Sequence, residues 1–138
     1  MEIIKIPFVE KVGVVKNQDG NLSLAFDESN ENHLQTIHAS ALFTLAESAS
    51  GEALQAEFPE LVGKVVPVVR DSQIKFKKPA EKSVTAFPKI SEESVSKFKT
   101  QFQKRNRSSI AVEVVVKDFE ENVVCISTFN WFVQGVEQ

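Results

Sequence analysis

The chain has 138 residues, of which 42% are hydrophobic and 25% charged, and this composition excludes a disordered or fibrous protein. The length fits one globular domain, which we expect to span residues 1–138. The formal net charge of −3 argues against a dedicated nucleic-acid binder. No apolar run reaches the ~18 residues that cross a bilayer, and Glu2 and Glu10 stand where a secretion signal is basic and then apolar. We therefore expect a cytoplasmic protein that makes no membrane contact.

Residues that build metal and cofactor sites are scarce in this sequence. One cysteine and two histidines provide neither an internal disulfide nor the ligands of a zinc module. The five glycines form no phosphate-binding loop and no dinucleotide motif, so we expect no metal and no cofactor. Cys125 lies in an apolar segment without a neighbouring base, which predicts a buried structural thiol.

The first half of the chain predicts a hairpin followed by a long helix. Residues 11–16 and 22–26 alternate in hydrophobicity on either side of an Asp-Gly pair, which is typical of a tight β-hairpin. From Thr36 to Phe58, small and apolar residues recur at helical spacing, and the next residue is Pro59. This pattern predicts a helix of about 20 residues that ends before the proline.

The second half predicts four strands and one shorter helix. Residues 65–76 and 84–90 are strand-like. Ser91–Arg105 begins with a serine N-cap and two glutamates, ends with basic residues and carries one apolar stripe, so it predicts an amphipathic surface helix. Residues 109–117 and 123–133 predict a long antiparallel hairpin. We expect four phenylalanines of these strands to build the core: Phe76, Phe87, Phe129 and Phe132.

The long helix has small side chains on most of its faces and contains no lysine or arginine. Such a helix is buried rather than laid on a surface, so the sheet must wrap around it. The order of elements then predicts an α+β domain in which a curved antiparallel sheet surrounds one central helix. Because some six strands leave open sheet edges, we expect at least a homodimer, and a homotetramer if dimers pair again.

Glu47 stands in the middle of this buried helix. Its neighbours three and four residues away are Phe43, Thr44, Ser50 and Gly51, and none of them is a cation. A carboxylate in such a place either finds a distant partner or has a raised pKa, as a general base near neutral pH requires. We therefore predict Glu47 as a catalytic residue.

A second group of polar residues lies at the start of the same helix. Asn32, His38 and the peptide N–H groups of Ala39 and Ser40 gather where unpaired donors and the helix dipole favour developing negative charge. Nine residues separate His38 from Glu47, which places them more than about 10 Å apart along an unbroken helix. They can cooperate only if two helices lie antiparallel across a dimer axis, with Glu47 of one subunit opposite the helix start of the other.

The segment from Asn32 to Glu47 resembles the hot-dog-fold acyl-CoA thioesterases, in particular their phenylacetyl-CoA thioesterase-like group. The resemblance rests on an asparagine, a histidine six residues later and an acidic residue nine residues after that, in an Ala/Leu-rich helix. The strand that closes with Phe76 and then Pro79 is similar to a family strand, and the final hairpin also fits. The resemblance implies a hot-dog fold with one short extra helix.

The resemblance also implies roles for individual residues. Glu47 would activate water or attack the thioester directly, His38 and Asn32 would orient the substrate and the attacking group, and the Ala39 N–H would polarise the thioester oxygen, with Ser40 beside it. The expected partner is an acyl-CoA or an acyl carrier. The family commonly has His-Gly-Gly where this chain has His38-Ala39-Ser40.

Two other functions are compatible with the same fold. A non-catalytic acyl-CoA binder would have lost the Gly-Gly turn at the helix start, as this chain has. A hot-dog hydratase or dehydratase would pair a histidine with a carboxylate, but the proline- and glycine-rich helix entry of those enzymes is absent. The segment Lys64–Arg107 contains 12 basic residues against 4 acidic ones and would suit the phosphates of coenzyme A, or it forms solvated strand and helix faces.

Overall fold

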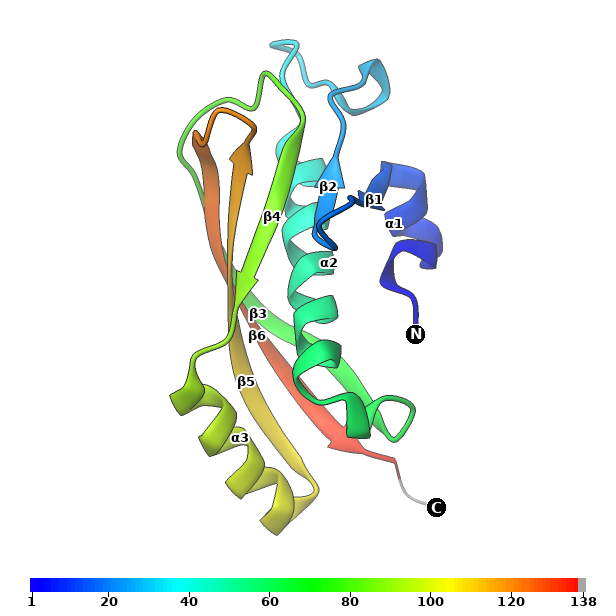
Figure 1. Ribbon diagram of the computed structural model, residues 1–138, viewed down its shortest axis with the longest axis vertical. Coiled ribbons are helices and arrows are strands. Elements are labelled where there is room, and N and C mark those ends of the chain that lie inside the picture. Colours follow the sequence, from blue (N-terminus) through cyan, green and yellow to red (C-terminus); the bar gives the residue numbers. More distant parts are fainter. Residues whose placement is uncertain (137–138) are drawn as a thin grey trace.

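The computed structural model describes residues 1–136 and contains one six-stranded antiparallel sheet curled around a long helix (Figure 1). The strands are β1 (Val14–Lys16), β2 (Leu22–Leu24), β3 (Val65–Phe76), β4 (Val84–Lys89), β5 (Arg107–Asp118) and β6 (Val123–Gly135). They lie in the order β1-β2-β4-β5-β6-β3. The predicted curved antiparallel sheet around a central helix is confirmed.

The helical elements lie before, inside and beside this sheet. They are η1 (Ile3–Lys5), α1 (Pro7–Val12), η2 (Glu28–Asn30), α2 (Ala39–Glu57), η3 (Pro59–Leu61) and α3 (Glu92–Arg105). Within residues 1–136, none of these helices combines the length and the hydropathy that a membrane span needs.

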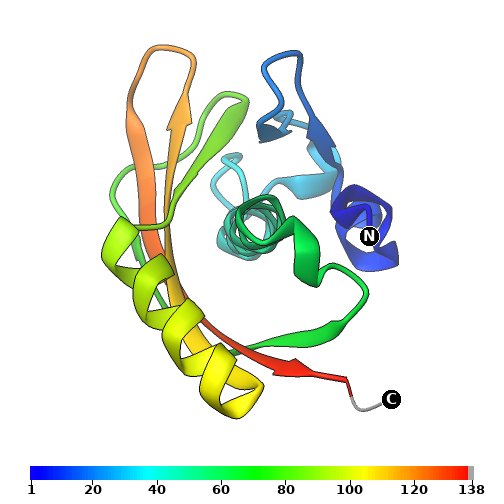
Figure 2. The ribbon, with the colours of Figure 1, turned by 60° about the horizontal axis from the view of Figure 1, so that its bottom comes forward.

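Helix α2 is the predicted central helix, and its small residues explain how the sheet surrounds it. It packs against β2, β4, β5 and β6, and the curvature of the sheet around it is visible end-on in Figure 2. Ala46 is fully buried, and Gly51 lies so close to the Trp131 ring that an added Cβ would be 3.3 Å from it. Larger side chains at these positions would push the strands away from the helix.

Helix α3 confirms the predicted amphipathic surface helix. The Ser91 hydroxyl accepts a hydrogen bond from the Ser94 N–H at the first turn, and Asn106 ends the helix in the left-handed conformation. Phe98 is the buried residue of the helix, and its ring lies 4.6 Å from that of Phe58, the C-cap of α2. One face of α3 therefore closes the lower end of the core beside β5.

Two predictions about the sheet were wrong. The strand expected over 11–16 begins only at Val14, because the preceding residues form α1, with Pro7 in its first turn and Gly13 ending it at φ 102°. Of the four strand phenylalanines expected in the core, Phe129 is fully buried, whereas Phe76 and Phe87 are 47% and 40% exposed. Alternation along a strand gives the face of a residue but does not show whether anything covers that face.

Strand β3 is a long and poorly covered sheet edge. Among the strands of residues 1–136 it pairs with β6 alone, and all of its residues are at least partly exposed. Val66 and Val68 are 56% and 46% exposed. Phe76 is paired in register with the buried Cys125, so it lies on the concave face, yet about half of its surface stays exposed. A long apolar edge of this kind is a template for pairing with another strand.

Candidate active site

The start of α2 is held by the loop before it. The His38 N–H donates to the Asn30 carbonyl at 2.7 Å, and the Ile37 N–H donates to the Ala80 carbonyl at 2.9 Å. Asn30 is buried, and its side chain donates to Ala25 and accepts from the Asp27 N–H. Sequence reasoning missed Asn30, although its Asp27-x-x-Asn30 spacing is a capping-box signal.

His38 is the N-cap of α2. Its Nδ1 accepts the Ser40 N–H at 2.9 Å, so in the neutral imidazole the proton lies on Nε2. His38, Ala39 and Ser40 are all exposed. Because the Ser40 N–H is already used by His38, the Ala39 N–H is the one of the pair that makes no hydrogen bond within residues 1–136. It lies at the positive end of a 19-residue helix.

Asn32 is engaged within its own loop. Its Oδ1 accepts the Leu34 and Thr36 N–H groups at 2.8 and 3.1 Å, and its Nδ2 donates to the Thr36 hydroxyl at 2.8 Å. These bonds close the turn that leads into Ile37 and His38. In this conformation the Asn32 side chain shapes the entry to α2, and it retains one amide hydrogen for any further contact.

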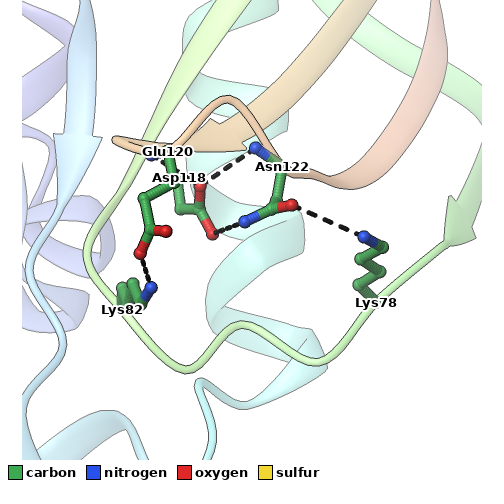
Figure 3. Close-up of polar contacts among 5 residues, drawn as sticks. All are labelled: Lys78, Lys82, Asp118, Glu120 and Asn122. Carbon is green, nitrogen blue, oxygen red and sulfur yellow. Dashed lines mark hydrogen bonds and ion pairs between the residues drawn. The ribbon is translucent and has the colours of Figure 1, made fainter.

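A network of polar contacts between two loops supports the chain segment that leads into α2 (Figure 3). Lys82 forms an ion pair with Glu120, and the Lys78 ammonium donates to Asn122 at 3.4 Å. Asn122 in turn donates to the Asp118 carboxylate at 3.0 Å. The loop between β3 and β4, which carries the Ala80 carbonyl, is thereby tied to the turn between β5 and β6.

Glu47 lies two turns into α2, on the helix face that is turned toward β6 and η1. One turn earlier, Phe43 packs edge-on against Phe129 of β6 at 5.4 Å; one turn later, Gly51 faces both Trp131 and Ile3. The Glu47 carboxylate makes no hydrogen bond or ion pair within the described part of the chain, and burial raises its pKa. Among residues 1–136, Glu47 is therefore an acid with no cation beside it, as the sequence suggested.

The backbone at Glu47 is fixed by a short chain of hydrogen bonds. The Trp131 indole N–H donates to the Ser50 hydroxyl at 2.9 Å, and that hydroxyl donates to the Glu47 carbonyl at 2.6 Å. Sequence reasoning did not find this contact, because Ser50 and Trp131 are far apart in the chain. The link fixes the turn of α2 that carries the carboxylate.

Within one chain the two parts of the site do not meet. Helix α2 runs unbroken from Ala39 to Glu57, so Glu47 lies about 12 Å along the axis from Ala39 at ~1.5 Å per residue. Cys125 is fully buried, which raises its pKa to about 11 and leaves it an inert thiol. Within residues 1–136 no cluster of three or more acidic, histidine or cysteine side chains forms a metal site.

The raised pKa of Glu47 predicts a stability effect that can be measured without a substrate. An acid whose pKa is raised by folding binds its proton more tightly in the folded state, so it lowers stability as pH rises above the ordinary glutamate value of about 4.3. Glu47→Gln removes this penalty. We expect the variant to melt a few degrees above the wild type at about pH 8 and at the same temperature at about pH 4.

The matched control for this prediction is Glu52→Gln, five residues further along the same helix, where Glu52 forms an ion pair with Lys16 at 3.3 Å. That change should give no gain at alkaline pH. Scanning calorimetry at one fixed protein concentration measures both variants. A Glu47→Gln variant that melts below the wild type at about pH 8 would show that the carboxylate is held by a favourable partner.

Comparison with known proteins places these features in a family. Residues 4–133 match the family described as Domain of unknown function (DUF4442). The chain belongs to the DUF4442 family. None of the curated proteins matches this DUF4442 chain in sequence.

Solved structures show the fold of this DUF4442 protein. A Pseudomonas aeruginosa protein of unknown function, described as a probable thioesterase, is 24% identical with a TM-score of 0.77, over 97% of this chain and 91% of its own. A Chlorobaculum tepidum protein of unknown function is 18% identical with a TM-score of 0.81, covering 96% and 88%. A Bacillus halodurans protein crystallised with CoA is 20% identical with a TM-score of 0.70, covering 91% and 74%. The shared architecture is the hot-dog fold, which confirms the resemblance seen in the sequence.

Proposed function

We propose that this protein is an acyl-CoA thioesterase that works as a homodimer in the cytoplasm. The observation that carries the proposal is the Glu47 carboxylate, which is half-buried and has a raised pKa. Within residues 1–136 it has no cation beside it, and the Ala39 N–H at the exposed start of the same helix has no acceptor. Two hot-dog neighbours support the substrate class: the Pseudomonas protein is described as a probable thioesterase, and the Bacillus protein was crystallised with CoA.

The open edge of the sheet supports the proposed dimer. A second copy that pairs along β3 would satisfy the free edge and cover Val66 and Val68. It would also bring its own α2 over the exposed concave side of β3, where Phe76 lies. In an antiparallel pair of α2 helices, Glu47 of each subunit lies beside the His38-Ala39 turn of the other. The two groups can then act together, although about eight residues of helix, ~12 Å, separate them within one chain.

In the proposed reaction the thioester carbonyl lies against the Ala39 N–H. Glu47 takes a proton from a water molecule while the water oxygen attacks the carbonyl carbon, and the Ala39 N–H stabilises the oxyanion. The carbon–sulfur bond then breaks, and the thiolate of coenzyme A takes the proton from Glu47. Direct attack by Glu47, followed by hydrolysis of the anhydride, uses the same carboxylate. The His38 Nε2–H orients the substrate or the attacking group, and Asn32 holds the turn on which His38 stands.

An acyl-CoA panel tests this proposal. We expect the wild type to release free thiol, detected with a thiol reagent, and the rate to fall by about 10² or more in Glu47→Gln. Thermal melting and circular dichroism of the variant verify that it is folded.

Two other results would replace the proposal. Loss of enoyl absorbance without release of thiol would identify a hydratase. A rise in melting temperature with acyl-CoA, without either reaction, would identify the non-catalytic binder that the Ala39-Ser40 turn suggests.

A further inference from the structure

The turn of α2 that follows Glu47 is covered by one large side chain. Ser50 and Gly51 are three and four residues after Glu47, so they form the next turn on the same helix face. The Trp131 indole spans both: its N–H donates to the Ser50 hydroxyl at 2.9 Å, and its ring carbon Cζ2 would lie 3.3 Å from a Cβ on Gly51. The ring therefore lies about one turn, ~6 Å along the axis, from Glu47.

The two neighbouring turns of the helix differ in how completely they are closed. One turn before Glu47, Phe43 packs against Phe129 at 5.4 Å, and Phe129 is fully buried. One turn after it, Trp131 keeps 8% of its surface exposed, and Ile3 of η1, which flanks the same turn, keeps 9%. The accessible wall beside the carboxylate is therefore the one that Trp131 and Ile3 form.

An acyl group that reaches Glu47 is expected to lie along this wall. Coenzyme A is large and carries charged phosphates, so it leads toward solvent, and the acyl part of the thioester is directed onto apolar surface. The indole N–H of the wall is already used by Ser50. With carbon–carbon bonds of about 1.5 Å an extended chain gains about 1.25 Å per carbon, so ~6 Å holds four or five carbons beyond the carbonyl.

We propose that Trp131 limits the length of the acyl group, so that the protein hydrolyses short acyl-CoAs, up to about six carbons, in preference to long ones. This limit rests on the proposed hydrolysis and names its substrate class. A longer chain meets the indole ring, which can move aside only if its hydrogen bond to Ser50 breaks. The Ser50 hydroxyl also donates to the Glu47 carbonyl, so displacement of the ring disturbs the turn that carries the carboxylate.

Beyond the ring, α2 continues with the same apolar face. Leu54 and Phe58 follow Glu47 by seven and eleven residues, which is helical spacing, and both are buried. A smaller residue at position 131 therefore opens space beside an apolar surface. A chain of more than six carbons can then extend along it.

Hydrolysis of a series of acyl-CoAs tests this limit. Acetyl-, butyryl-, hexanoyl-, octanoyl-, decanoyl- and palmitoyl-CoA are compared by kcat/KM, below the concentrations at which long-chain acyl-CoAs aggregate. We expect the wild-type value to fall about tenfold or more from hexanoyl- to decanoyl-CoA, and Trp131→Ala to lose this fall. Trp131→Phe keeps most of the packing, and we expect it to favour octanoyl- over butyryl-CoA about tenfold more than the wild type does.

The matched control is Phe132→Ala. Phe132 follows Trp131 in β6 and lies on the opposite face of the sheet, where the Arg70 guanidinium is 3.9 Å from the centre of its ring. Loss of this aromatic ring should leave the acyl preference unchanged. A wild type that hydrolyses palmitoyl-CoA as well as butyryl-CoA would overturn the limit, as would Trp131 variants that are folded by circular dichroism and keep the wild-type preference.

Failure of the proposed hydrolysis gives a different result. If no acyl-CoA releases thiol, the activity is wrong, and the melting temperature with the same acyl-CoAs then measures which chain lengths fit. A rise that is largest for short chains in the wild type and for long chains in Trp131→Phe supports the limit set by Trp131. Equal rises for all lengths, or no rise, contradict it.

Discussion

Glu47→Gln and His38→Asn chains, each inactive as homodimers, are expected to regain thioesterase activity when they are produced together. In the proposed dimer, each active site takes Glu47 from one subunit and His38 with Ala39 from the other. A mixed dimer then contains one site with both changes and one intact site. Random pairing yields about a quarter of wild-type activity, because half of the dimers are mixed and each has one working site of two.

Asparagine is the right replacement for His38. The imidazole Nδ1 caps the helix by accepting the Ser40 N–H, and asparagine is a strong N-cap residue that preserves this contact while removing the second ring nitrogen. Each single variant should lose about 10² or more of its rate. Distinct affinity tags on the two chains allow the mixed dimer to be isolated and its rate measured against both homodimers.

The control is a pair of changes in one chain. Wild-type chains mixed with the double variant Glu47→Gln/His38→Asn give mixed dimers in which both sites carry one change, so those dimers are expected to be inactive. If instead that mixed dimer is half active and the complementing pair is inactive, Glu47 and His38 act within one subunit. The ~12 Å of helix between Ala39 and Glu47 speaks against that arrangement.

Local signals in the sequence were enough to find the helices that carry and flank the site. The run of small residues before Pro59 gave α2, and Ser91 with its two following glutamates gave α3. Each rests on contacts within a few residues, such as the Ser91 hydroxyl with the Ser94 N–H. Glu47 was also found from local sequence, because the residues within one helical turn on each side of it include no cation.

The features that sequence reasoning missed depend on distant contacts. Nothing near Val65–Phe76 indicates that this strand pairs with β6 at the edge of the sheet and not with the next strand in the chain. The exposure of Phe87 depends on what lies over the outer face, which alternation along β4 does not encode. In the site, Trp131 reaches Ser50 across 81 positions of sequence. The use of the Ser40 N–H by His38 depends on the orientation of one imidazole ring.

Ala39→Pro is expected to abolish most of the activity while leaving the fold intact. Ala39 is the first residue of α2, and its N–H has no acceptor within residues 1–136. Proline at this position removes that N–H, and its fixed φ suits the first helical turn. The residue before a proline must be extended, and His38 already is, at φ −60° and ψ 139°. Removal of one oxyanion donor lowers kcat by about 10² to 10³.

Ala39→Ser is the matched control, because it adds one hydroxyl and keeps the N–H. We expect its kcat to stay within a few fold of the wild type, while Ala39→Pro melts at or slightly above the wild-type temperature, since proline reduces the freedom of the unfolded chain. Stopped-flow detection of thiol release gives kcat, and calorimetry gives the melting temperature. If Ala39→Pro retains full kcat in a folded protein, the Ala39 N–H is not the oxyanion donor.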